Sequence, residues 1–275
     1  MSASFEVRFR GVRGSIACPG PGTAGYGGNT ACIELRCGER LVVLDAGTGL
    51  RGLGADLAGQ GPFEADILLS HTHLDHVIGL PFFAPLFDAR NRFALRAGHL
   101  ADRGGVRQVL ERMLSPELFP VPLEGFAADL RCLDFHAGEA FALGDGIQVR
   151  TAPLDHPGGA TGYRVEFGGR SVCYVSDTGH KPGEPNGHIL GLIEGADIVI
   201  YDAMFTEEEF ARRPDWGHST WNEGVRLCEV AGAETLVLFH HDPRRDDEAM
   251  VRLGAEAAER RPGTLVAQEG AVLSL

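Results

Sequence analysis

Lysine is almost absent from this chain of 275 residues, in which 25 Lys and Arg face 38 Asp and Glu and the net charge is −13. Binding to the phosphates of a long nucleic acid needs clustered basic side chains. The composition therefore argues against a polynucleotide partner. A small anion remains allowed, because the net charge does not determine the local field at one site.

Long apolar runs and paired cysteines are also missing. No apolar segment approaches the roughly 18–20 residues of a membrane span, and no basic region leading into an apolar one opens the chain. The six cysteines form no CxxC pair. We therefore expect a cytoplasmic protein without a membrane partner, whose cysteines are reduced and buried rather than bridged or bound to a structural zinc.

No Pro- and Gly-rich linker divides the chain, so we expect a single domain over residues 1–275. Short apolar and β-branched runs predict strands at residues 5–9, 31–35, 41–44, 67–69, 93–95, 147–149, 163–167, 171–175, 198–201 and 235–239. Helical periodicity appears in residues 106–113, with Asp102 as the expected cap, and in residues 225–231. There, Thr220-Trp221-Asn222-Glu223 has the pattern of a capping box. A last helix is predicted from Asp246 to Arg260.

Residues 71–76 read His-Thr-His-Leu-Asp-His, directly after an apolar run. Imidazole and carboxylate groups bind divalent ions such as zinc, and three protein ligands with one open position form the catalytic pattern. His71 and His73 lie two residues apart and point the same way in an extended chain, whereas Asp75 and His76 need a turn to serve a second position. The string predicts a metal site, and a histidine-rich loop without function is the alternative.

Other potential ligands stand where apolar runs end. Taken singly, an Asp at such a place is a turn or cap residue. In a sheet covered by helices, however, strand ends on one side meet at one rim, where a rigid scaffold positions functional loops. We therefore expect one site from the residues that end these runs, namely Asp45, His71, His156, Asp177, Asp202 and His240.

The chain resembles the metallo-β-lactamase superfamily of hydrolases, because five motifs come in the order of that family. They are DAGTGL at 45–50, SHTHLDHVIGLP at 70–81, LDHPGG at 154–159, SDTG at 176–179 and FHHDP at 239–243. The resemblance spans nearly the whole chain. It implies an α/β fold, the four-layer αββα sandwich, with two divalent metal ions at the rim between the sheets.

The resemblance also implies a ligand set. The first metal takes His71, His73 and His156, the second takes Asp75, His76 and His240, and Asp177 bridges them. Zinc is the expected metal, with manganese or iron as alternatives. A hydroxide between the ions is the implied nucleophile, since bound cations lower the pKa of water. We count Asp75 among the catalytic residues as well as among the ligands.

The formal charge of such a centre favours an anionic substrate. Two divalent ions, two carboxylates and one hydroxide leave about +1, and the same ions stabilise charge on the oxygens of a phosphodiester. A hydrolase of lactones, thioesters or other carboxyl esters is the alternative. His73 and the lack of a flavin domain argue against a di-iron redox protein. The complete ligand set argues against a binding module without catalysis.

One further motif resembles a particular branch of this superfamily. Gly217-His218-Ser219-Thr220 resembles the His-Ser-Thr segment of the phosphodiesterase branch, which includes RNase Z and cyclic-phosphate phosphodiesterases. The resemblance implies that His218 acts as a general acid or as a donor to a phosphoryl oxygen, near the positive end of a helix. A surface histidine is the alternative.

Arg244 lies four residues after His240 and is predicted to bind the substrate phosphate. Its alternatives are to brace the loop or to join a solvated charge cluster with Arg245 and the acidic pair that follows. His241 competes with His240 for the metal, but strand alternation points it away. His180 follows Asp177 by three residues and could reach the rim.

RNase Z enzymes carry a long arm that binds tRNA, inserted between the third His motif and the bridging Asp. Here only a strand hairpin separates His156 from Asp177, so no arm fits. We therefore predict a small or cyclic phosphodiester as substrate, with a homodimer left open. The glycine run Gly20–Gly28 resembles a loop that approaches the site in the same branch, and a plain flexible loop is its alternative.

Overall fold

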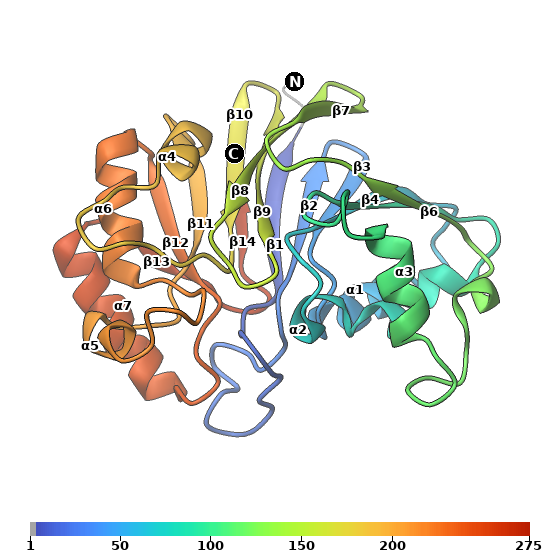
Figure 1. Cartoon of the computed structure of the whole chain (residues 1–275), viewed down its shortest axis with the longest axis horizontal. Helices are drawn as coiled ribbons and strands as arrows, with labels where there is room; N and C mark the ends of the chain where they lie inside the picture. The colour runs from blue at the N-terminus through green and yellow to red at the C-terminus, as the bar shows by residue number, and fades with distance from the viewer. Residues whose placement is uncertain (1–3) are drawn as a thin grey trace.

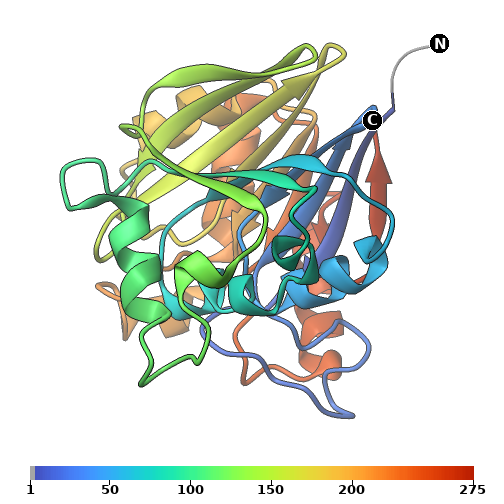
Figure 2. The ribbon, with the colours of Figure 1, turned by 90° about the vertical axis from the view of Figure 1, so that its right-hand side faces the viewer.

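Two seven-stranded sheets lie face to face in the computed structural model, which describes residues 4–275 (Figures 1 and 2). Strand order is β14-β1-β2-β3-β4-β5-β6 in the first sheet and β13-β12-β11-β10-β9-β8-β7 in the second. Helices α1, α2 and α3 lie on one side of the sheets and α4, α6 and α7 on the other (Figure 1). The predicted four-layer αββα sandwich is confirmed.

The first sheet uses both ends of the chain. Its strands are β1 (Phe5–Gly11), β2 (Cys32–Cys37), β3 (Arg40–Leu44), β4 (Glu64–Leu69), β5 (Arg92–Ala97), β6 (Asp129–Asp134) and β14 (Val272–Ser274). The helices on its side are α1 (Gly49–Leu57), α2 (Leu74–Val77) and α3 (Gly105–Met113), with short 3-10 turns at Leu80–Phe82, Ala84–Phe87 and Leu123–Gly125.

The second sheet is built from the C-terminal half. Its strands are β7 (Ala140–Gly144), β8 (Ile147–Leu154), β9 (Ala160–Phe167), β10 (Arg170–Val175), β11 (Ile198–Asp202), β12 (Thr235–Phe239) and β13 (Leu265–Val266). Its helices are α4 (Gly187–Ile193), α5 (Glu207–Ala211), α6 (Trp221–Ala231) and α7 (Asp247–Arg260).

Apolar residues on both faces of strands such as β3 explain why their runs in the sequence are unbroken. In β3, Val42 and Leu44 pack against the second sheet, whereas Leu41 and Val43 pack under the helices. The sheets therefore enclose one central core, and a second and third core lie between each sheet and its helices. A strand buried on both faces needs apolar side chains at every position.

Two predicted helix starts are corrected. Asp102 does not cap α3, because Gly104 and Gly105 both have positive φ and turn the chain; instead, the Asp134 carboxylate accepts from Val106 N (2.9 Å). At α6 the capping box is half formed: Thr220 accepts from the backbone of Glu223 (3.1 Å), but the Glu223 carboxylate binds Arg226. The predicted helix from Asp246 to Arg260 is confirmed, with Asp246 as its cap.

Parallel pairing sets the position of the strand ends. Strands β3 to β6 pair in parallel, as do β10 to β13, so their carboxyl ends lie at one edge of each sheet. The two edges form a common rim. Among the residues that the structure describes, no helix is long and apolar enough to cross a membrane. The single domain over residues 1–275 stays a prediction.

Candidate metal centre

The predicted metal ligands lie together at this rim. Four follow β4 directly or lie at α2, and three follow β8, β10 and β12 of the second sheet. All of them except one exposed histidine are buried. They are His71, His73, Asp75, His76, His156, Asp177 and His240, with His73 the exposed one.

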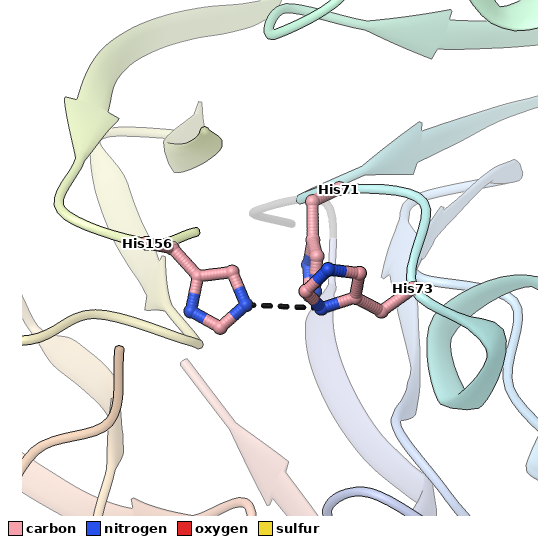
Figure 3. Close-up of side chains that lie close together, drawn as sticks. All are labelled: His71, His73 and His156. Carbon is pink, nitrogen blue, oxygen red and sulfur yellow. Dashed lines mark hydrogen bonds between the residues drawn. The ribbon is translucent and has the colours of Figure 1, made fainter. Parts of the chain in front are cut away.

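The first group consists of three histidines that face one another across the seam between the sheets. Figure 3 shows His156 opposite His71 and His73. The His156 Nε2 and His73 Nδ1 atoms are 3.1 Å apart, and one nitrogen from each ring lies within 4.8 Å of the others. Three imidazole nitrogens that converge in this way can hold one divalent ion.

The second group combines a carboxylate with two imidazoles. Asp75 Oδ2 lies 3.2 Å from His76 Nε2 and 3.3 Å from His240 Nε2. The two Nε2 atoms are 3.2 Å apart. These three atoms therefore form a nearly equilateral triangle, as the ligands on one face of a metal ion do.

Asp177 stands between the two groups. Its Oδ1 atom faces the first group, 3.9 Å from His71 Nε2 and 3.8 Å from His156 Nε2. Its Oδ2 atom faces the second, 3.1 Å from His76 Nε2 and 3.2 Å from His240 Nε2. One carboxylate can therefore reach both groups with different oxygens.

The spacing of the donor atoms fits divalent ions. Two ligand atoms bound at zinc distances in tetrahedral geometry are about 3.3 Å apart. The atom pairs within the second group match that value to about 0.2 Å. In the first group, His71 Nε2 is buried without a hydrogen-bond partner. A buried polar atom normally has a partner, and a metal ion would be one.

Hydrogen bonds behind the ligands orient their rings. The buried Asp45 carboxylate contacts His76 Nδ1 (2.7 Å) and also accepts from Ser70 and Tyr174. The Gly217 carbonyl lies 2.7 Å from His156 Nδ1. Partners of this kind leave Nε2 free for a metal. Sequence reasoning placed Asp45 at a strand end without giving it a role, and no sequence signal identifies a backbone carbonyl.

Three residues of this centre have a left-handed backbone. Asp45 and His240 directly follow β3 and β12, and Asp177 lies two residues after the end of β10; their φ angles are 59°, 57° and 58°. This conformation costs energy for residues other than glycine, although Asp and His tolerate it better than most. Such outliers cluster at functional sites, because the sharp turn aims a side chain into the rim.

A loop from the N-terminal part supports the second group. The backbone N–H of Ser15, itself at a φ of 63°, donates to Asp75 Oδ2 (2.7 Å). The glycine run Gly20–Gly28 instead contacts Asp247 and Glu269. The part of the loop that reaches the centre is therefore Gly14–Ser15, just before the predicted run.

His218 lies beside the cluster in the second sheet's half. Its Nδ1 atom is 3.1 Å from the Asp202 carboxylate and 3.6 Å from Asp177 Oδ1. Burial alone would lower the pKa of His218, but the adjacent Asp202 carboxylate outweighs burial and raises the pKa to about 9. Asp202 at the end of β11 thus fixes this ring, a role that sequence reasoning did not assign.

The ligands in the cluster differ in the direction of their pKa shifts. Burial lowers the pKa of His71 far below its usual range, so this imidazole is neutral, the form that binds metals. Burial alone would raise the pKa of Asp75, but His76 and His240 lower it. The pKa of His76 is raised despite its burial, because the carboxylates of Asp177, Asp75 and Asp45 surround it. Without a metal ion, a proton on His76 would offset the negative charge of these three carboxylates. A bound metal cation can offset the same charge.

Three other predicted contacts are placed as follows. The Arg244 guanidinium pairs with the Asp242 carboxylate, and its side chain is 59% exposed, so in this structure it braces its own loop. His241 points away from the cluster, with Nε2 2.8 Å from the Ala267 carbonyl. His180 packs on Phe210 with ring centroids 4.1 Å apart. Substrate binding by Arg244 stays a prediction.

Comparisons with known proteins agree with this geometry. A family model described as "Beta-lactamase superfamily domain" matches residues 40–241. The chain is 26% identical over 312 aligned positions to a protein named Ribonuclease Z from Bradyrhizobium sp. (strain ORS 278), and the alignment covers 96% of this chain and 98% of that one.

Solved structures share the fold. The metallo-beta-lactamase fold protein YhfI from Bacillus subtilis superposes with a TM-score of 0.74 at 20% identity, over 99% of this chain and 100% of that one. A structure described as a new diphosphatase from the PhnP family gives 0.71 at 20% identity, over 98% of both chains. Because the family model covers well over half of the sequence, the chain belongs to the beta-lactamase superfamily domain family, and it is a metal-dependent hydrolase.

Proposed function

We propose that this hydrolase is a phosphodiesterase that uses two metal ions and cleaves a small or cyclic phosphodiester. The position of Asp177 carries the proposal: its two oxygens face two separate groups of donor atoms. His71, His73 and His156 would hold one ion, and Asp75, His76 and His240 the other, with zinc as the expected metal. When bound, such ions make water nucleophilic near neutral pH and stabilise charge on phosphoryl oxygens.

Side chains of the protein would supply a proton to the leaving group and orient the metal ligands. Asp202 holds His218 by Nδ1, which leaves Nε2 as the atom able to donate a proton to a leaving-group oxygen. The Ser15 backbone N–H donates to Asp75 Oδ2 and so holds this oxygen toward His76 and His240. The buried setting of His218, with only 11% of its side chain exposed, limits competing water.

Several features favour a small substrate over tRNA. Only the β9–β10 hairpin separates His156 from Asp177. The alignment with the Bradyrhizobium relative spans 312 positions, more than the 275 residues of this chain, so that relative carries segments that this chain lacks. The net charge of −13 further disfavours a polyanion.

The test is a side-by-side assay of zinc-, manganese- and iron-loaded protein. We expect hydrolysis of bis(p-nitrophenyl) phosphate and of a cyclic nucleotide, and much slower turnover of a lactone and thioester panel. The variant His218→Ala should lose about 100-fold or more in kcat on the phosphodiester. The opposite result, ester or lactone turnover that does not change in His218→Ala, with no phosphodiester cleaved, would assign the carboxyl-ester function instead.

A further inference from the structure

A fully buried arginine lies beside the segment that carries His240. Arg13 follows β1 by two residues, and its relative exposure is 0%. Its guanidinium donates to the backbone carbonyls of Gly27 (2.8 Å), Arg245 (2.7 Å) and Asp242 (3.3 Å). The Nη2 atom of this guanidinium is also buried and has no hydrogen-bond partner. One side chain therefore links the N-terminal loop to the segment that follows β12.

The charge of this arginine is not neutralised by a neighbouring acid. Within residues 4–275, no carboxylate pairs with the guanidinium, whose acceptors are all backbone carbonyls. The Asp242 carboxylate pairs with Arg244, and the Glu269 carboxylate accepts from Asn29. Burial of a charge without a counter-charge is unfavourable. Stability alone therefore does not account for Arg13, and an incompletely paired buried group calls for another explanation.

The segment that Arg13 holds begins at a strained metal ligand. His240 has a φ of 57°, a left-handed conformation that persists in a residue other than glycine only where surrounding contacts enforce it. Backbone hydrogen bonds restrain the next residue, since the His241 N–H donates to the Val12 carbonyl (2.9 Å) and the Gly14 N–H donates to the His241 carbonyl (3.0 Å). Arg13 adds bonds to two carbonyls further along the segment. Together these contacts hold the turn at His240.

Arg13 also precedes the turn that supports the carboxylate of the second group. The Ser15 N–H donates to Asp75 Oδ2 (2.7 Å), and Ser15 has a φ of 63°. The Arg13 N–H donates to the Asn29 carbonyl (2.9 Å), so the backbone and the side chain of Arg13 both fix the start of this turn. In the described part of the chain, Arg13 has no hydrogen bond to a ligand of the first group. Its contacts lead to the second group.

We propose that Arg13 is a positioning residue for the second metal ion: it holds the His240 ring and, through Ser15, the Asp75 carboxylate at the spacing that one ion requires. This inference rests on the ligand sets of the proposed function. Arg13 itself would touch neither the ion nor the substrate. A guanidinium presents donors in a fixed planar fork, which lets one side chain bind carbonyls of separate segments, whereas a lysine ammonium is a single point. Geometry, rather than charge, is the property that the ion site requires.

The experiment measures zinc affinity at each site separately. His73→Ala removes a ligand of the first group and leaves the second site for study, and His240→Ala does the reverse. Each metal-free protein is titrated with Zn²⁺ against a chelator of known affinity. In the His73→Ala background, Arg13→Gln should weaken zinc binding by about 10- to 100-fold, as loss of a partner behind a metal ligand typically does. In the His240→Ala background, we expect the same change to alter zinc affinity by less than about twofold.

Two further variants separate positioning from other roles. Arg13→Lys keeps the buried charge but not the fork, and it should lose second-site affinity nearly as strongly as Arg13→Gln. Arg13→Lys also carries the test if Arg13→Gln does not fold. Arg164→Gln is the matched control: Arg164 lies in β9, is 9% exposed, donates to the carbonyls of Leu192 (3.1 Å) and Glu194 (2.7 Å) and pairs with Glu166. This control should lower the melting temperature of the metal-free protein without changing either zinc affinity.

The outcomes separate this inference from the proposed function. The inference is wrong if Arg13→Gln weakens both sites equally or leaves second-site affinity unchanged, if Arg164→Gln reproduces the loss, or if Arg13→Lys retains full affinity. Failure of both Arg13 variants to fold, while Arg164→Gln folds, would assign Arg13 to folding instead. Because no substrate is used, each of these results leaves the two-metal function standing. Wild-type protein that binds fewer than two zinc ions would contradict the proposed function, and this inference with it.

Discussion

At the scale of single residues, two glycines determine how closely the backbone approaches the metal ligands. A Cβ atom at Gly217 would lie 2.5 Å from His156 Nδ1, and one at Gly14 would lie 2.5 Å from His240 Nδ1. Gly217 also has a φ of 75°. Neither position can take a side chain without moving an imidazole of the centre.

This gives a prediction for metal binding. Gly217→Ala should displace His156 and Gly14→Ala should displace His240, so we expect each variant to bind about one metal ion per chain and the wild type to bind the proposed two. Metal content after gel filtration, measured by mass spectrometry, checks this. Gly52→Ala is the matched control, because a Cβ there meets nothing within 4 Å. Retention of two ions by both variants would contradict the proposed ligand sets.

A second residue-scale prediction concerns His218. Asp202→Asn removes the carboxylate that holds His218 Nδ1, and we expect kcat on a phosphodiester to fall about 10- to 100-fold with little loss of metal. Because both residues act as one unit, Asp202→Asn combined with His218→Ala should be no slower than His218→Ala alone. Additive losses would show that Asp202 acts through another group, such as its bond to Thr178.

Much of the centre was predictable at this scale, and the remainder has a physical reason. The ligand string and the distant His156, Asp177 and His240 carry their chemistry in their side chains, and the structure brings them together. Two supporting contacts were not predictable, because Gly217 contacts His156 through its backbone carbonyl and Ser15 contacts Asp75 through its backbone amide. Arg244 shows the opposite case: its nearest carboxylate, two residues away, engages it in this structure.

At the scale of elements, α6 connects the site to the core. The helix begins directly after His218-Ser219, and it packs Val225 and Leu227 against the second sheet. Its first turn depends on the Thr220 hydroxyl, which accepts from the backbone N–H of Glu223 (3.1 Å). A cap of this kind satisfies an N–H group that has no partner within the helix.

Loss of this cap should reduce stability. We expect Thr220→Ala to lower the free energy of unfolding by about 1 kcal/mol and the melting temperature by about 2–4 °C. Thr220→Ser keeps the hydroxyl and should lose clearly less. Thermal unfolding followed by circular dichroism measures both variants. Equal losses for alanine and serine would mean that packing of the threonine methyl group, rather than the cap, stabilises the helix start.

The strands that the sequence failed to predict are those with little apolar pattern. In β6 the residues alternate between exposed and half-buried, and β7 has a single buried residue, Leu143. Strands β13 and β14 are two and three residues long. Each of these four strands lies at a sheet edge, where one side has no neighbour and polar residues are tolerated. The ten interior strands carry stronger apolar patterns, continuous in strands such as β11 and alternating in β1 and β8, and all ten were predicted.

At the scale of the whole molecule, both proposed metal sites take ligands from both sheets. His71 and His73 follow β4 of the first sheet, whereas His156 follows β8 of the second. The second group divides in the same way, with Asp75 and His76 on one side and His240 on the other. Metal binding should therefore stabilise the contact between the two halves.

Metal removal tests this. A ligand that binds only the folded state adds RT ln(1 + [L]/Kd) to its stability, so chelation should lower the melting temperature by several degrees and added zinc should restore it. Differential scanning fluorimetry with and without a chelator measures the shift. An unchanged melting temperature in protein shown to have lost its metal would contradict binding across the seam.

The cysteines allow a separate test of the core. Cys32, Cys37, Cys173 and Cys228 are buried, and no cysteine is bridged. Burial raises the pKa of Cys37, Cys173 and Cys228 to about 12, so their thiolate forms are scarce near pH 8. We expect at most two fast-reacting thiols, Cys18 and Cys132, in a thiol titration of the native protein, and six after denaturation. A greater number in the native state would mean that the core opens readily.

The order of the motifs made the global fold predictable, because each motif follows a strand and the family resemblance arranges those strands. The pairing of the two chain ends in one sheet was not predictable, since β14 is short and carries no motif.

The division of the ligands between the sheets also bears on the stage of folding at which metal ions can bind. Residues 71–76 are synthesised early, but each proposed ion needs a histidine from the C-terminal half, the last being His240. A nascent or partly folded chain therefore offers only an incomplete set of donors. With the proposed ligand sets, we expect metal binding to follow the docking of the two halves, so that only a folded chain can hold both ions.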